Sequence, residues 1–198
     1  MRLKKMTVVW LEGENACKSG IKLFKSQNIT DPIKILKFLM KKEKYADTNW
    51  LIVRLMTYRE RVAYAVFAAE QVIGYYEKKY PDCDAPRNAI NAARKCIKAP
   101  SKKNKAAAAA AVYAVYAAAA GTDYAAYAGA AAAYAGASGA SCAAYAGASC
   151  AAYAGGAASY AGASCASYAA GAYAAATAAA AVYVKILKYG IKLLEGGK

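Results

Sequence analysis

Apolar positions recur at helical spacing along most of the chain. The clearest case is a run whose apolar face comprises Ile33, Leu36 and Leu39. It is preceded by Asp31, which is a favourable helix-capping residue, and by Pro32, at the position where a proline commonly starts a helix. The pattern therefore predicts a helix that begins near Pro32 and buries one face.

Similar start and stop signals delimit further helices. Thr57 and Glu60 have the spacing of a capping box, and Pro81 ends the run that they open. Asp84 and Ser101 are capping residues for two later helices. Besides the helix after Asp31, helices are predicted within residues 14–25, 48–56, 57–80, 84–99 and 101–120.

Only the segment TVVWLE, residues 7–12, looks strand-like, and one short strand cannot make a sheet. Pro86 falls near the first turn of the helix after Asp84, and Gly121 ends the alanine run as a C′ residue, after which Thr122 starts another helix. The predicted fold class is all-α. We expect a helical bundle or stacked helical hairpins, with a long Ala/Tyr-rich helical C-terminal half.

The C-terminal half has an unusual composition of Ala, Gly, Ser, Cys and Tyr. If residues 122–184 form helix at about 100° per residue, one set of tyrosines falls within a sector of roughly 100°. Four glycines (129, 136, 147 and 162) fall close to the opposite face, where they would let helix backbones approach closely. Gly155-Gly156 and residues 136–141 are expected breaks. The tyrosines of the stripe are Tyr124, Tyr127, Tyr134, Tyr145, Tyr153 and Tyr160.

Two interpretations of this tyrosine stripe stay open. Tyrosine offers a large amphipathic contact area at low entropic cost, so the stripe is a candidate partner-binding or self-association face. The alternative is internal packing between helices. For Tyr64, Tyr75 and Tyr76, we expect half-buried packing.

The charge is concentrated outside the alanine-rich segment. The chain has 198 residues and a net charge of +15, from 27 Lys and Arg against 12 Asp and Glu. Between residues 106 and 184 the only charged residue is Asp123. We therefore divide the chain into a basic helical part, 1–100, and an Ala/Tyr-rich part with a basic amphipathic tail, 101–198, and expect one continuous fold.

Histidine is absent, which removes the commonest general base and metal ligand. No C-x-x-C pair occurs, so we expect neither a metal site nor a cofactor. No secretory signal is recognisable at the start, and a reducing cytoplasm with free thiols is the expected location. Each cysteine is expected to be a small buried hydrophobe. The cysteines are Cys17, Cys83, Cys96, Cys142, Cys150 and Cys165.

Membrane association is not expected. The uncharged segment 124–184 exceeds the roughly 20 residues that span a bilayer, but it contains no Leu, Ile or Phe. The tail could lie on a membrane surface. We favour a terminal helix packed on the body. Its lysines would lie on one face and its apolar side chains elsewhere on the helix. These lysines are Lys185, Lys188 and Lys192, and the apolar residues are Ile186, Ile191 and Leu194.

Three other functional classes receive little support from the sequence. Nucleic-acid binding is not expected, because the lysines are scattered and no recognition motif occurs. An ice-binding helix would need a flat Ala and Thr array, and the segment has Thr only at 122 and 177. An enzyme would need a cleft built from Glu60, Glu70, Tyr58 or a thiol. The spacing does not suggest one, and no catalytic residue is assigned.

Three motifs carry a resemblance to a known family. They are AC-x-x-G at 16–20, RV-x-Y-A-x-x-A-A-E-x-V at 61–72, and YEKKYPDCDAPRNAI at 76–90. With them the chain resembles the alanine-rich immunity proteins of bacterial polymorphic toxin loci, an immunity-five-like group that is also phage-borne. The resemblance begins near residue 14; it is specific over 54–105 and compositional beyond. It implies an all-helical, non-enzymatic, cytoplasmic protein that neutralises a partner by binding it.

The chain departs from this family pattern in two ways. Tyr, Ser and Gly interrupt the alanine run where relatives carry Arg, Asp or Glu, which favours a recognition face or a homo-oligomer. The net charge of +15 suits an acidic toxin, a membrane-facing toxin or an anionic small ligand better than a basic nuclease. No binding residue is carried over from the family, because the motifs look like a fold signature.

Two hypotheses of function follow. The first is a non-enzymatic immunity or inhibitor protein that sequesters a protein partner, either a toxin or a defence component. The alternative is a binder, or sponge, of an anionic ligand such as a nucleotide signal or nucleic acid, with Lys and Arg on phosphate and Tyr on bases. Phosphate-led binding would weaken steeply with ionic strength, whereas a Tyr/Ala protein interface would not.

Overall fold

The computed structural model describes residues 3, 5–118, 133 and 170–196 of the chain. Within these ranges every regular element is a helix, which confirms the all-α prediction. The helices are α1 (Val8–Gly13), α2 (Lys18–Gln27), α3 (Pro32–Lys41), α4 (Tyr45–Leu55), α5 (Tyr58–Glu70), α6 (Ile73–Lys79), α7 (Ala85–Lys98), α8 (Lys102–Ala118) and α11 (Ala170–Leu194).

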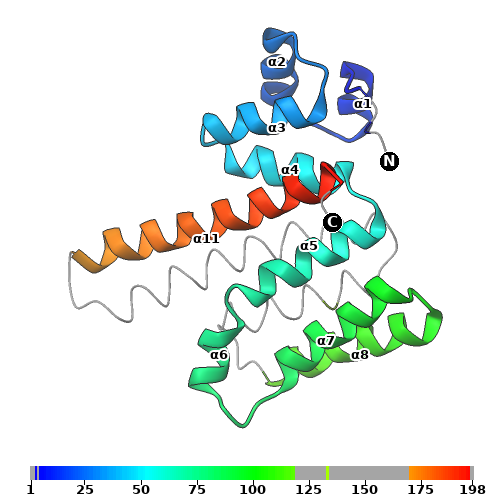
Figure 1. Cartoon of the computed structure of the whole chain (residues 1–198), viewed down its shortest axis with the longest axis vertical. Coiled ribbons are helices and arrows are strands. Elements are labelled where there is room, and N and C mark those ends of the chain that lie inside the picture. Colours follow the sequence, from blue (N-terminus) through cyan, green and yellow to red (C-terminus); the bar gives the residue numbers. More distant parts are fainter. Residues whose placement is uncertain (1–2, 4, 119–132, 134–169, 197–198) are drawn as a thin grey trace.

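The helices form two groups joined by α11 (Figure 1). At one end α1 packs against α2, and α3 packs against α4. At the other end α7 packs against both α5 and α8. The C-terminal helix α11 runs along α4 and α5 and so contacts both groups.

Three of the predicted helix caps are present. Asp31 Oδ1 accepts a hydrogen bond from the Lys34 backbone N–H at 3.0 Å. Thr57 and Glu60 form the reciprocal capping box, at 2.7 and 3.4 Å. Ser101 Oγ accepts from the backbone N–H of residue 104 at 3.2 Å. Asp84 occupies the N-cap position of α7, but its side chain makes no capping hydrogen bond there.

The strand-like interpretation of residues 7–12 is wrong. This segment is helix α1, because the Thr7 hydroxyl accepts a hydrogen bond from the Trp10 backbone N–H at 3.1 Å and caps its first turn. The run from 57 to 80 is also not one helix. It breaks after Glu70, and Val72 and Ile73 next to the turn are buried at 1% and 3% exposure.

The basic tail packs on the body, as predicted. Ile186 and Leu187 are fully buried, while Lys185 and Lys188 are exposed. The helix packs tightly at Gly190. A Cβ atom added there by substitution would lie 2.8 Å from Tyr64 Cε2 and 2.9 Å from Ile52 Cγ2. A side chain of any size at this position would push α11 away from α4 and α5.

Tyr64 and Tyr76 are more deeply buried than predicted, at 0% and 2% exposure. The Tyr64 hydroxyl donates to Asn49 Oδ1 at 2.8 Å, so the buried phenol and the buried amide satisfy each other. Tyr189 of α11 stacks on Phe67 of α5, with ring centroids 3.9 Å apart. Aromatic contacts therefore fix α11 against α5.

Buried alanines accompany larger residues such as Val62, Ile90 and Val115 on α5, α7 and α8. Because an alanine side chain is only a methyl group, helices that meet through alanines can approach closely. Six alanines on these three helices are completely buried: Ala65, Ala68, Ala69, Ala89, Ala93 and Ala108.

The predictions for the alanine-rich segment fall outside the described residues. They include Gly121, Thr122 and the tyrosine stripe at 124, 127, 134, 145, 153 and 160. The side chain of Tyr75 is likewise not described, and the division of the chain near residue 100 stays a prediction. Across the part of the chain that the structure does describe, no helix has the length and apolar character needed to cross a membrane.

Candidate functional site

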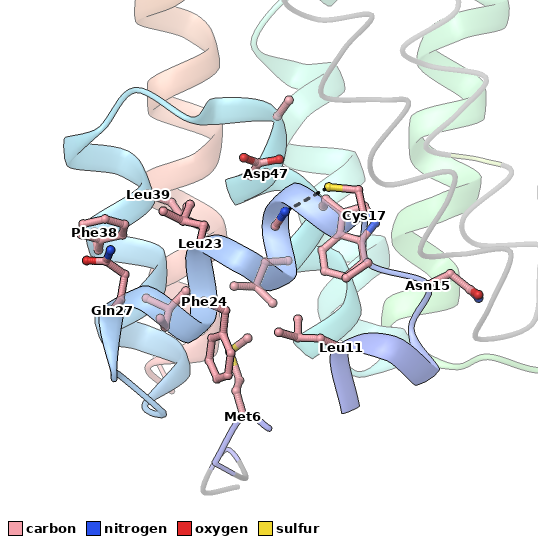
Figure 2. Close-up of a pocket in the computed structure, with 16 residues that line it drawn as sticks. Met6, Leu11, Asn15, Cys17, Leu23, Phe24, Gln27, Phe38, Leu39 and Asp47 are labelled. Carbon is pink, nitrogen blue, oxygen red and sulfur yellow. Dashed lines mark hydrogen bonds between the residues drawn. The ribbon is translucent and has the colours of Figure 1, made fainter. Parts of the chain in front are cut away.

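A pocket of about 310 Å³ opens among α1, α2, α3 and α4 at the N-terminal end of the molecule (Figure 2). Its wall is largely apolar. The lining residues are Met6, Leu11, Asn15, Ala16, Cys17, Gly20, Leu23, Phe24, Gln27, Ile35, Phe38, Leu39, Ala46, Asp47, Trp50 and Leu51.

Helical periodicity explains why these residues meet. On α2 the lining positions are 20, 23, 24 and 27, and on α4 they are 46, 47, 50 and 51. Both sets follow the i, i+3, i+4 spacing that places side chains on one helix face. The pocket therefore lies where the inner faces of neighbouring helices converge without filling the space between them.

The deepest part of the lining carries no polar side chain. Met6, Leu11, Ile35, Leu39 and Leu51 each expose 6% or less of their surface. Around them, the rings of three half-buried aromatic residues, Phe24, Phe38 and Trp50, complete the wall. A group that enters this space exchanges water for hydrocarbon and aromatic contacts.

The lining contains no lysine or arginine. Its one carboxylate, Asp47, lies 3.9 Å from the ammonium group of Lys44. The nearby Arg54 guanidinium stacks over the Trp50 ring at 4.0 Å and lies 3.6 Å from the carboxylate of Glu14. Lys44 and Arg54, two cations beside the pocket, thus already have partners, although the chain as a whole is strongly basic.

Cys17 is exposed and lines the pocket, which contradicts the prediction of a small buried hydrophobe. It is the N-cap of α2: its Sγ accepts a hydrogen bond from the Gly20 backbone N–H at 3.3 Å and lies 3.2 Å from Ser19 Oγ. The hydrogen bond with Ser19, followed by that from Gly20, lowers the pKa of the Cys17 thiol. Cys17 therefore caps α2 at the wall of the pocket rather than packing in the core.

The other described cysteines have structural positions. Cys96 is fully buried, as predicted, and its burial raises its pKa. Burial, followed by the influence of Cys96, raises the pKa of Tyr58 to about 12. Cys83 is half-buried and lies 3.1 Å from the hydroxyl of Tyr76. Cys142, Cys150 and Cys165 are outside the described residues.

The two carboxylates considered for catalysis, Glu60 and Glu70, are engaged in structural contacts, as is Glu77. Glu60 completes the capping box of α5, and Glu70 pairs with Arg94. Glu77 forms a bidentate ion pair with Arg87 at 2.6 and 2.7 Å, and the hydrogen bonds from Arg87 lower its pKa. None of the three lines the pocket. No cluster of three metal-ligating side chains occurs among the residues that the structure describes.

The pocket was not identified from the sequence. Its lining residues look like the inner faces of ordinary amphipathic helices, and a periodic pattern does not show whether such faces fill the space between them. One local signal was available: Cys17 and Gly20 have the i, i+3 spacing of an N-cap within the motif AC-x-x-G. The six tyrosines of the predicted stripe lie outside the described residues.

Comparisons with protein-family models, with curated proteins and with solved structures find no match to this chain. The immunity-protein resemblance therefore stays a prediction from the motifs alone.

Proposed function

We propose that this chain is a non-enzymatic binding protein that sequesters a small ligand in the pocket among α1 to α4. The observation that carries the proposal is the open, apolar space of about 310 Å³. Its volume reaches the range of about 300 to 1,000 Å³ that is typical of ligand sites. Its many apolar residues and few polar ones also match such sites.

Two features of the pocket support binding rather than catalysis. Its only carboxylate, Asp47, has Lys44 as a partner, and its lining offers no cation that could stabilise an anionic transition state. The candidate acids Glu60 and Glu70 hold a helix cap and an ion pair elsewhere. Without a paired acid and base at the pocket, retention of the ligand is the better-supported role.

In this proposal the biological role is that of an inhibitor or immunity protein, as the family resemblance implies. A sequestering protein neutralises its target by mass action and needs no chemical step. We place this activity in the cytoplasm, where the thiols of Cys17, Cys83 and Cys96 would stay reduced.

A protein partner, either a toxin or a defence component, is the second candidate. Val9, on the short helix that contributes Leu11 to the pocket, is 78% exposed. Together with the half-buried rings of Phe38 and Trp50, it would offer the apolar anchor points that protein interfaces use. A nucleotide receives less support, because its phosphates would find no lysine or arginine in the lining.

The test uses N-phenyl-1-naphthylamine, a neutral apolar dye whose emission rises in apolar surroundings. Ala46 lines the pocket and is exposed, so Ala46→Phe should fill the site without disturbing the core. The matched control is Ala107→Phe, at an exposed alanine of α8. We expect wild type and the control to bind the dye alike, and Ala46→Phe to bind at least about tenfold more weakly.

Equal binding by wild type and Ala46→Phe would contradict the proposal, because the dye would then lie elsewhere. Ala16→Phe, which fills the pocket from another wall, provides an independent second variant. Wild type and the variants could all fail to bind the dye while Ala46→Phe stops the chain from neutralising a co-expressed toxin. In that case the pocket is instead a contact site for a protein partner.

A further inference from the structure

The geometry points to a specific ligand class for this pocket. We propose that it takes a neutral amphiphile, with an apolar body of about ten to twelve carbon atoms and an uncharged hydrogen-bonding head group. The inference rests on the proposed function, since it names the ligand class of the same site.

The size of the apolar body follows from the pocket volume. An engineered cavity of about 150 Å³, lined by Leu, Ile and Phe side chains, accommodates benzene with its six carbon atoms. The pocket of about 310 Å³ is twice as large and has a comparable lining. It should therefore hold about twice as many carbon atoms.

The part of the ligand that contacts the pocket floor must be a hydrocarbon group without polar atoms. Leu11, Ile35, Leu39 and Leu51 present only aliphatic carbon, and a polar group pressed against them would lose its hydrogen bonds to water without replacement. Met6 adds an unbranched thioether that can adapt to chains of slightly different shape. An unbranched chain or a flat hydrocarbon group fits such a floor.

Two polar groups of the lining, Asp47 and Cys17, are placed to meet a head group. In Figure 2, Asp47 and Cys17 lie at the upper end of the pocket, whereas Met6 and Phe24 lie at its lower end. The amide of Asn15 also belongs to the lining. A ligand whose chain reaches toward Met6 would therefore bring its head close to Asp47 and Cys17.

Neither sign of charge suits this upper end. An anionic head would face the Asp47 carboxylate without a lysine or arginine in the lining. A cationic head would compete with Lys44, which already lies 3.9 Å from Asp47, in a chain of net charge +15. A hydroxyl or amide head can donate a hydrogen bond to the Asp47 carboxylate at no such cost.

The experiment uses Trp50 as a reporter, because it lines the pocket and is one of only two tryptophans in the chain. In a Trp10→Phe background, its emission is followed during titration with 1-hexanol, 1-octanol, 1-decanol and 1-dodecanol. Each added methylene should tighten binding about fourfold until the pocket is full. We expect this gain to stop between about ten and twelve carbon atoms, with a Kd for 1-decanol of roughly 10⁻⁵ to 10⁻⁴ M.

The head group is tested at constant chain length with 1-decanol, decanoate and decylammonium, all below their aggregation limits. We expect 1-decanol to bind at least about tenfold more tightly than either ion. Asp47→Asn should bring decanoate closer to 1-decanol while changing the affinity for 1-decanol less than about threefold. Ala46→Phe should abolish the response, and Ala107→Phe should leave it unchanged.

Two results would overturn the ligand class. One is an affinity that keeps rising beyond 1-dodecanol and is unaffected by Ala46→Phe, as expected for adsorption to the surface. The other is a charged ligand that binds as tightly as 1-decanol; if Ala46→Phe still blocks it, the proposed binding function stands and only the head group is wrong. Failure of both the alcohols and N-phenyl-1-naphthylamine would overturn the proposed function as well.

Discussion

The two ends of the molecule differ in how much alanine their helix contacts contain. Around α5, α7 and α8, buried alanines such as Ala68, Ala89 and Ala108 allow the helix backbones to lie close together. Around α1 to α4, the buried residues are large, and Leu11 and Leu39 are examples. The pocket lies at the second end.

The difference shows how side-chain size decides where a ligand can bind. Large side chains hold neighbouring helices apart and meet at their tips, so an imperfect fit leaves a volume that another molecule can occupy. Methyl groups bring the backbones together and leave little space to share. We infer that the alanine-packed end supports the fold, whereas the end built from large side chains carries recognition.

The largest effect on stability is expected at Gly190, where α11 lies against α4 of one end and α5 of the other. Gly190→Val should lower the free energy of unfolding by about 3 kcal/mol, because its side chain would collide with Tyr64 and Ile52. Denaturant unfolding followed by circular dichroism measures this. Gly74→Ala is the control: nothing lies within 4 Å of its Cβ position, so it should be neutral or slightly stabilising. Equal losses in the two variants would contradict the close packing of α11.

The next largest effect concerns the buried pair that joins α4 to α5. Tyr64→Phe removes the hydroxyl that donates to Asn49 at 2.8 Å, and should cost about 1 to 2 kcal/mol of unfolding free energy. Tyr80→Phe, at a residue that is 41% exposed, should change stability by less than about 0.5 kcal/mol. If Tyr64→Phe lowers the unfolding free energy no more than Tyr80→Phe does, the hydrogen bond from Tyr64 to the buried Asn49 amide does not contribute to stability.

A smaller effect should appear in the reactivity of the pocket thiol. Because Ser19 and Gly20 lower the pKa of Cys17, this residue should react with iodoacetamide at pH 7 faster than Cys96, which is buried. Ser19→Ala removes the larger of the two causes and should slow labelling of Cys17 about threefold. Peptide mass spectrometry resolves each site. Unchanged labelling in Ser19→Ala would exclude the hydroxyl as the cause.

The smallest effect is the pH dependence contributed by Tyr58. Its pKa is raised to about 12 in the folded chain, chiefly by burial, so folding favours the neutral phenol. The stability gained from this is fully present below pH 10 and is lost as the pH rises from about 10 to 12. The stability of Tyr58→Phe should therefore fall less steeply than that of wild type as the pH rises from about 10 to 12. An identical alkaline unfolding curve for wild type and Tyr58→Phe would contradict this contribution.

Local signals in the sequence were sufficient for most helix boundaries. Asp31, Ser101 and the Thr57–Glu60 pair are capping groups whose hydrogen bonds need only three neighbouring residues. The prediction failed at residues 7–12 because the β-branched run suggested a strand, while Thr7 in fact caps a single short helix. The break after Glu70 was missed because it goes with the burial of Val72 and Ile73, and burial depends on contacts that are distant in sequence.

The candidate site was much harder to predict than the fold. Its lining comes from four helices, from Met6 before α1 and from residues 15–17 between α1 and α2. Whether the inner faces of these elements fill or enclose a volume is decided by tertiary packing. The sequence drew attention instead to the unusual tyrosine stripe. Cys17 was misjudged for a related reason: its residue type favours burial, whereas its position as an N-cap keeps it exposed.

Hydrogen–deuterium exchange with and without 1-decanol distinguishes the two ends most directly. The method reports local opening at each helix, and a bound ligand slows exchange where it stabilises the structure. We expect slower exchange in α2 and α4, which line the pocket, and no change in α7 or α8. Protection confined to α7 and α8, or protection of α2 and α4 that persists in Ala46→Phe, would contradict the assignment of recognition to the pocket.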